Sequence, residues 1–321
     1  MKKLILLCLV CISTLFASCN SSSNDYWIDN PTEEPITVYI DDTAYDIPPV
    51  TMIQITLEYG KHQLKYNNQE ITIHNGGRVN KGQAIINPTQ STYVFFKQNF
   101  FNFNDERTTE EFIEWAIGTQ SDSVRLKIND SIATVFIPFK PCNKLIIDKH
   151  DFDWKYNLDE PMPEGLTLTN PIITRGNRNL VNDPNYQAGK FQETAYKVYR
   201  EREFKDYLKS VNDATIEFLV EKTPYASLPK AKINLTLLND IADPQYRKAL
   251  EECVKEFNQW LDAKGSKSTD GFKEVLMGSK LRDLKSEYLH KHPDDYSFNA
   301  AVNEFDEQKN IFMRYQLNII E

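Results

Sequence analysis

Residues 36–47 read Ile36-Thr37-Val38-Tyr39-Ile40-Asp41-Asp42-Thr43-Ala44-Tyr45-Asp46-Ile47. Apolar and polar residues alternate on either side of Asp41-Asp42, which is the period of two of strands with one buried face. A two-residue Asp or Asn turn between such runs predicts an antiparallel hairpin. The pattern returns around Asn67-Asn68 and Asn129-Asp130. We therefore expect an antiparallel β-sandwich over residues 26–190.

The first of these hairpins is part of a longer pattern. The strand and turn at residues 36–42 are followed by the proline link Ile47-Pro48-Pro49 and then by Leu57-Glu58-Tyr59-Gly60-Lys61-His62-Gln63-Leu64. This order resembles PEGA-like β-sandwich modules of exported proteins. The resemblance implies a non-catalytic module that packs against cell-surface components or partner domains.

Residues 191–321 show a helical period instead. Asp243-Pro244 supplies an N-cap and a proline at the first helical position, and further helices are expected after Thr269-Asp270 and from about Asp295. Each helix carries one apolar stripe, which predicts an antiparallel helical bundle and an α+β fold for the whole chain. The stripes consist of Tyr246, Leu250, Cys253, Phe257 and Trp260, then Met277, Leu281, Leu284 and Tyr288, then Phe298, Val302, Phe305, Phe312 and Ile319.

Two segments of the first half differ from the strand pattern. Residues 108–115 begin with hydroxyl side chains followed by acids, which predicts a short helix. Residues 157–190 are rich in Pro, Asn and Gly, which predicts a long irregular connection.

The first eighteen residues, 1–18, have the composition of an export signal. Lys2 and Lys3 precede a short apolar run, which is typical of a signal peptide. The run ends in Leu15-Phe16-Ala17-Ser18-Cys19, which resembles the lipobox of bacterial lipoproteins such as those of the Bacteroidota, with Phe16 where that family usually has an aliphatic residue. The resemblance implies cleavage before Cys19, lipidation of Cys19 and an outer-membrane anchor. We expect residues 19–25 to be a flexible tether and the periplasmic face to be favoured over the cell surface.

The net charge bears on the class of partner, and two cysteines outside the signal region leave two possible states. The net charge is −9, and no Lys- or Arg-rich run is present. This charge pattern disfavours a nucleic-acid partner, because such partners attract basic surfaces. Cys142 and Cys253 either form one disulfide or remain two buried thiols.

No set of residues in the sequence points to catalysis or to a cofactor. There is no nucleophile elbow and no phosphate-binding glycine loop, and Ser227-Leu228-Pro229-Lys230 lacks the companion motifs of Ser-x-x-Lys enzymes. Asp148-Lys149-His150-Asp151-Phe152-Asp153 is the densest polar group. In a strand His150 would face away from both later aspartates, whereas in a loop the carboxylates could bind a hard cation, although their spacing matches no calcium-loop pattern. His62 and His74 are expected at surface or half-buried strand positions.

The aromatic residues Phe100, Phe101 and Phe103 suggest a binding patch for a protein or a glycan. The alternative, which we favour, is that they fill the junction between the two domains.

Three sites resemble the Asp-Ser/Thr-aliphatic acceptor of the general O-glycosylation system of Bacteroidota, with hydroxyls at Thr43, Ser123 and Ser131. Together these features predict a non-enzymatic, membrane-anchored lipoprotein with an envelope protein partner. A surface protein that binds glycans or host proteins is the first alternative, and an enzyme of unfamiliar fold is the second.

Overall fold

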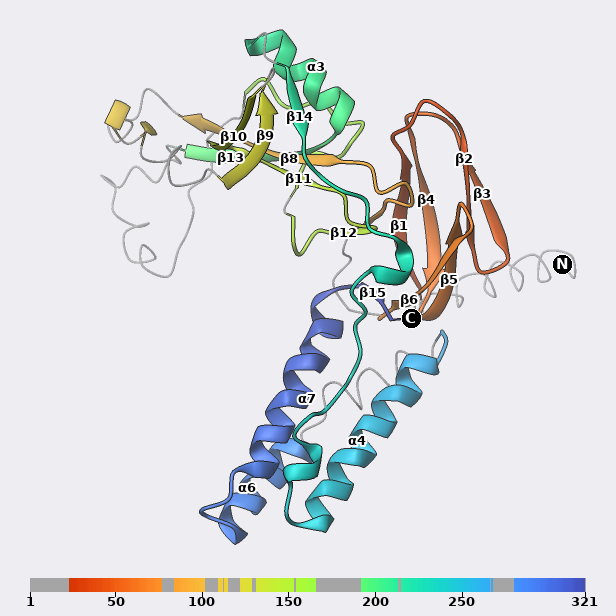
Figure 1. Cartoon of the computed structure of the whole chain (residues 1–321), viewed down its shortest axis with the longest axis vertical. Coiled ribbons are helices and arrows are strands. Elements are labelled where there is room, and N and C mark those ends of the chain that lie inside the picture. Colours follow the sequence, from red (N-terminus) through yellow and green to blue (C-terminus); the bar gives the residue numbers. More distant parts are fainter. Residues whose placement is uncertain are drawn as a thin grey trace, which may run out of the picture.

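Strands in the first part of the chain and helices near its C-terminus give a mixed α+β fold, as predicted. The computed structural model describes residues 23–76, 84–101, 109–111, 113–114, 122–128, 131–152, 154–165, 192–212, 215–265, 267 and 280–320. Figure 1 shows the sheets at one end of the molecule and three helices, α4, α6 and α7, projecting from them.

The predicted hairpin at residues 36–47 lies at the edge of a five-stranded antiparallel sheet in the order β15–β6–β5–β2–β3. Asp41, Asn67 and Asn68 have φ angles of 53°, 46° and 60°, the left-handed conformation used in tight hairpin turns. In β2 every second residue is buried, as the alternation predicts. The strands are β2 (Ile36–Ile40), β3 (Thr43–Ile47), β5 (Gly60–Tyr66), β6 (Gln69–Asn75) and β15 (Leu317–Ile319).

A four-stranded sheet in the order β12–β7–β1–β4 contains the N-terminal strand. β1 pairs antiparallel with β4 but parallel with β7. Residues 23–25, expected in the flexible tether, belong to β1, because Ser23 pairs with Glu58 and the Asn24 side chain donates to Asn75 at 3.1 Å. The strands are β1 (Ser23–Asn30), β4 (Thr51–Glu58), β7 (Ala84–Ile86) and β12 (Ile146–Asp148).

These two sheets share one apolar cluster, to which both contribute buried side chains. Tyr26, Ile28, Ile55 and Leu57 come from the four-stranded sheet, and Val38, Ile40, Leu64 and Ile73 come from the five-stranded sheet.

Two three-stranded sheets, β11–β8–β13 and β10–β9–β14, pack with α3 around a second apolar cluster. The sequence predicts mainly helix from residue 191, but β13 and β14 are strands. β13 is buried on both faces, so Ala195 and Val198 imitate a helical spacing. The elements are β8 (Tyr93–Phe101), β11 (Phe139–Cys142), β13 (Gln192–Arg200), β9 (Asp122–Ile128), β10 (Ser131–Ile137), β14 (Ile216–Phe218) and α3 (Glu201–Asn212).

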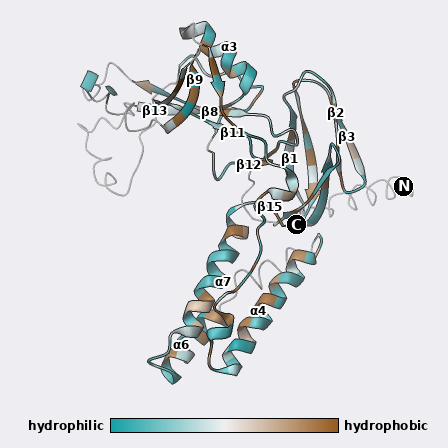
Figure 2. Cartoon of the chain, in the orientation of Figure 1, coloured by the Kyte–Doolittle hydropathy of each residue, from teal (hydrophilic) through white to brown (hydrophobic). Residues whose placement is uncertain are grey.

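Helices α4 (Pro244–Asp262), α6 (Lys280–Lys291) and α7 (Ser297–Arg314) pack around a third cluster, and short 3₁₀ turns η1 (Tyr225–Ser227) and η2 (Leu238–Asp240) precede them. The Asp243 side chain accepts a hydrogen bond from the Gln245 N–H, so the predicted N-cap is confirmed. Figure 2 shows hydrophobic and hydrophilic turns alternating along α4 and α7. Ile319, expected in the last helix, lies in β15, which pairs with β6. No helix in the described part of the chain is both long enough and apolar enough to span a bilayer.

The C-terminal end of α4 rests on the five-stranded sheet. Gly60 has a φ angle of +121°, and a Cβ atom there would lie 2.5 Å from the Ala263 carbonyl oxygen. The Gly265 N–H donates to the Tyr59 carbonyl at 2.8 Å. The helices are therefore attached closely to β5.

A buried ionic network joins β1 to β13. Both Nε and Nη2 of Arg200 donate to the carboxylate of Asp29, and the Tyr93 hydroxyl donates to the same carboxylate at 2.7 Å. Nη1 of Arg200 donates to Asp159 and Glu203. The guanidinium therefore has carboxylate partners on all three of its nitrogens.

Candidate functional site

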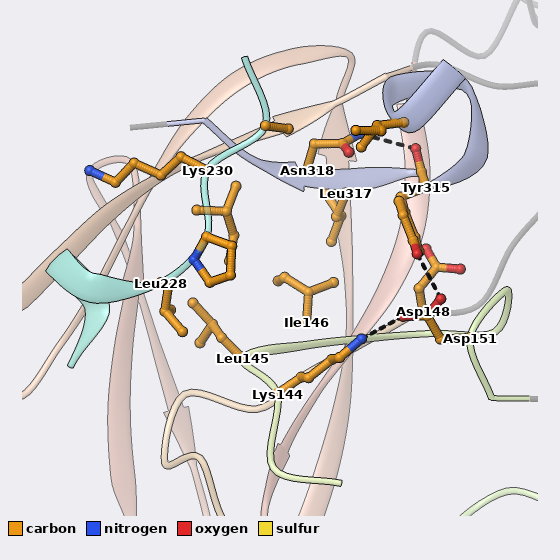
Figure 3. Close-up of a pocket in the computed structure, with 14 residues that line it drawn as sticks. Lys144, Leu145, Ile146, Asp148, Asp151, Leu228, Lys230, Tyr315, Leu317 and Asn318 are labelled. Atoms are coloured by element: carbon orange, nitrogen blue, oxygen red, sulfur yellow. Dashed lines mark hydrogen bonds and ion pairs between the residues drawn. The ribbon is translucent and has the colours of Figure 1, made fainter. Parts of the chain in front are cut away.

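A cavity of about 350 Å³ lies where the edges of two sheets meet the end of α7 (Figure 3). β12 and β15 are the terminal strands of their sheets and line it from two sides. Residues 228–231 line it from a third side, and the Ala231 N–H donates to the Ile319 carbonyl at 2.7 Å, which fixes this segment against β15. The cavity thus combines three segments that are far apart in the sequence.

The walls of the cavity are largely apolar. Leu145 and Leu317 are buried, whereas the Ile311 side chain is 43% exposed at the α7 side, so the apolar surface continues to solvent. A concave apolar surface with a few polar groups is the usual form of a ligand site. The larger aliphatic side chains of the lining are Leu145, Ile146, Leu228, Ile311, Leu317 and Ile319.

One end of the cavity carries a cluster of Lys144, Asp151 and Tyr315. Nζ of Lys144 lies 2.6 Å from one Asp151 oxygen, and the Tyr315 hydroxyl donates to the other at 2.7 Å. Partial burial raises the pKa of Asp151, but the bonds from Lys144 and Tyr315 outweigh it and bring this pKa below its ordinary value. Asp151 is therefore an ionised carboxylate with both oxygens engaged.

Asp148 closes the same end from β12. Its carboxylate accepts the backbone N–H of His150 at 2.8 Å and that of Gln316 at 3.3 Å. Burial raises the pKa of Asp148 more than these bonds lower it. The bond to Gln316 links β12 to the residue before β15, so Asp148 helps to hold the two edges together.

Of the two conformations considered for the segment around His150, a strand and a loop, the structure has a turn after Asp148. The Asp151 N–H donates to the Asp148 carbonyl at 3.1 Å, so the chain turns, and the His150 ring lies 3.6 Å from Asp151 and edge-on to Tyr315. Asp153 lies outside the described residues. Within the described ranges, no group of three His, Cys, Asp or Glu side chains could hold a metal ion.

Of the two polar residues of the Ser227–Lys230 motif, only Lys230 lines the cavity. Lys230 is exposed, and its ammonium makes no hydrogen bond or ion pair with any residue that the structure describes. Ser227 ends the 3₁₀ turn η1 and does not line the cavity. Figure 3 shows Lys230 and the Asp148–Asp151 end on opposite sides of the apolar walls.

Phe100 and Phe101 of the suggested aromatic patch lie on β8 and do not line this cavity. Phe100 and Phe101 are half-buried and pair with Glu193 and Gln192 of β13, so a partly accessible surface remains there. Phe103 lies outside the described residues, as does Cys19.

The three hydroxyls of the glycosylation motifs are accessible. Thr43, Ser123 and Ser131 are all exposed, and Thr43 and Ser131 are the first residues of strands β3 and β10. Sugar attachment at these positions stays a prediction.

The histidines of the five-stranded sheet are more buried than expected. His62 is bonded to Asp41 at 2.8 Å and to the Glu58 carbonyl at 2.7 Å. His74 is fully buried edge-on against Trp260, and neither of its ring nitrogens has a hydrogen-bond partner among the described residues. The sequence prediction is wrong here because α4 covers this part of the sheet.

The structure distinguishes between a disulfide and two buried thiols at Cys142 and Cys253. Cys142 and Cys253 are both buried and do not form a disulfide. Burial raises the pKa of Cys142 to about 11, so this thiol is protonated at neutral pH.

The sequence marked only part of the cavity. Asp148, His150 and Asp151 stood out as a polar group, but Tyr315 and the apolar walls gave no local signal, because segments brought together by strand pairing carry no shared motif. Comparison with known proteins adds no relative: no protein-family model, no curated protein and no solved structure matches the chain.

Proposed function

We propose that this chain is a non-enzymatic lipoprotein, anchored to the outer membrane through Cys19 and facing the periplasm, that binds another component of the cell envelope. The observation that carries the proposal is the apolar cavity between β12 and β15. Its carboxylates are engaged by neighbouring groups, and its walls offer apolar surface to a ligand. Such a site is suited to holding a molecule rather than transforming it.

The architecture in this proposal has two parts. The two sheets that share one apolar cluster act as a β-sandwich, and α4, α6 and α7 act as a helical bundle that projects from it. The cavity lies where the two parts meet, so a bound component would contact both. This position supports a role in binding or assembly.

The anchor is tested by metabolic labelling. Cells that produce the full chain are grown with radioactive palmitate, and a Cys19→Ser variant is the control. We expect label in the protein and recovery in the outer-membrane fraction for the parent chain only. Equal labelling of both chains would refute attachment at Cys19.

The cavity is tested by photocrosslinking in the same cells. A benzoylphenylalanine is placed at Ile311, which lines the cavity, or at Tyr296, which is 64% exposed at the other end of α7. We expect a light-dependent adduct with an envelope component from position 311 and none from position 296. Identical results at both positions would remove the support for binding at the cavity.

A further inference from the structure

We propose that the cavity between β12 and β15 binds an anionic amphiphile, with an alkyl chain along the apolar walls and a carboxylate or phosphate head at Lys230. This inference rests on the proposed function, because it names the class of ligand for the same cavity. It follows from three properties of the site, which are its shape, its unused hydrogen-bond donors and the shortness of its edge strands.

The walls specify the apolar part of the ligand. Ile146, Leu228 and Leu317 converge on one space in Figure 3, and about 350 Å³ is at the lower end of the range of ligand cavities, about 300–1,000 Å³. A single alkyl chain of moderate length suits a space of this size and shape better than a large fused-ring ligand.

The hydrogen-bonding capacity that remains specifies the head group. Asp151 is bonded on both oxygens, and Asp148 accepts two backbone N–H groups. Lys144 uses one of its three donors on Asp151. Lys230 makes no bond to any described residue. The unmet capacity is therefore cationic, and an anion complements it.

The edge strands argue against an added peptide strand as the occupant. β12 and β15 have 3 residues each, so they offer short ladders. The Ile319 carbonyl of β15 is already taken by the Ala231 N–H. Main-chain pairing, which provides most of the affinity when a peptide extends a sheet, is therefore limited here.

The experiment uses the full lipidated chain in nanodiscs of phosphatidylcholine, with a decanoic acid that carries a photoreactive diazirine. Labelled peptides are mapped by mass spectrometry, and empty nanodiscs measure partition of the probe into lipid. We expect saturable labelling within residues 144–151 and 311–319. Octanoate, decanoate and dodecanoate should compete with affinities that rise about fourfold for each methylene until the cavity is full.

Matched variants test the head group. Lys230→Glu should weaken decanoate by at least about tenfold, because it removes a charged hydrogen bond and adds a like charge. Lys232→Glu, an exposed lysine that does not line the cavity, should leave the affinity unchanged. Decanol should bind more weakly than decanoate and should not respond to Lys230→Glu. Decyl phosphate should compete, whereas inorganic phosphate should not.

Failure of this inference is distinguishable from failure of the proposed function. Equal competition by decanol and decanoate, with no effect of Lys230→Glu, would overturn the anionic head but leave the cavity as a binding site. Stronger competition by an apolar peptide than by dodecanoate, or displacement by inorganic phosphate alone, would also overturn the amphiphile. Absence of saturable labelling at the cavity would overturn the amphiphile. The photocrosslinking comparison of positions 311 and 296 would then decide separately whether the cavity binds another envelope component.

Discussion

The molecule contains two clusters of the same composition, a cation, a carboxylate and a tyrosine, in opposite surroundings. Arg200, Asp29 and Tyr93 join β1, β8 and β13, and the Arg200 and Asp29 side chains are 3% and 0% exposed. Lys144, Asp151 and Tyr315 lie at the cavity, where Lys144 is 57% exposed. Burial and the number of engaged donors, rather than residue type, therefore distinguish a structural lock, meaning a buried network that holds strands together, from a site that is available to a ligand.

The two cations illustrate this difference. The Arg200 guanidinium is bonded to three carboxylates, so it has little capacity left for a ligand. The Lys144 ammonium is bonded to one carboxylate and reaches solvent. Removal of Arg200 should therefore lower the free energy of unfolding more than removal of Lys144.

The largest effect is expected from Arg200→Met. The substitution leaves the buried Asp29 carboxylate without its cation, which should lower the free energy of unfolding by about 3–5 kcal/mol. Urea denaturation followed by circular dichroism measures it. Arg202→Met is the matched control, because Arg202 pairs with Glu33 on the surface, with exposures of 51% and 81%, and should cost less than about 1 kcal/mol. Similar losses for both variants would show that the buried network is not a lock.

The tyrosines provide a second comparison within the clusters. Tyr93→Phe removes a buried hydrogen bond to a charged group and should cost about 2 kcal/mol, whereas Tyr315→Phe should cost about 1 kcal/mol or less. Both substitutions delete one hydroxyl and keep the ring. The same denaturation experiment measures them, and a larger loss for Tyr315→Phe would reverse the comparison.

His74 shows the effect of burial on a group without hydrogen bonds. Its side chain is buried, and its ring nitrogens have no hydrogen-bond partner among the described residues. Burial, with smaller contributions from His62 and Lys61, lowers its pKa from the ordinary 6.5 to about 3, against the opposite effect of Asp262. The folded state therefore keeps a neutral imidazole while the unfolded state takes up a proton. Stability is fully present above pH 6.5 and is lost as the pH falls towards 3.

Between pH 7 and pH 5.5 this single group should lower the free energy of unfolding by about 1 kcal/mol. His74→Leu should remove that part of the pH dependence, and His290→Gln, an exposed histidine, should not. Urea midpoints at the two pH values give the difference between each variant and the parent chain. An unchanged difference in His74→Leu would mean that the imidazole is not held neutral in the fold.

The part of the fold that the sequence predicts well is local. The hairpin at residues 36–47 and the N-cap of α4 depend on neighbours in the chain, and the structure confirms both. β15 was missed because Ile319 continues the apolar spacing of α7, and only pairing with β6, far away in the sequence, makes it a strand. β13 was missed because a strand buried on both faces loses its alternation.

The candidate site depends still more on distant contacts. Its polar end includes the conspicuous Asp148–Asp151 group, but residue spacing alone did not decide between a strand and the turn that brings His150 beside Asp151. Lys230 stood in a Ser-x-x-Lys sequence without the companion motifs of such enzymes, and its place at the cavity comes from the bond between Ala231 and Ile319. Local pattern identifies such residues, while tertiary pairing decides which of them meet.

The smallest effect on stability is expected from Lys144→Met. Lys144 is more than half exposed, so its ion pair with Asp151 is screened by solvent, and its loss should cost less than about 1 kcal/mol, as should that of the surface pair in Lys65→Met. The local electrostatics should nevertheless change. Without the Lys144 bond, partial burial raises the pKa of Asp151 above its value in the parent chain, and a carboxyl NMR titration measures this rise. If Lys144→Met instead lost as much stability as Arg200→Met, the two clusters would be equivalent locks, and exposure would not distinguish them.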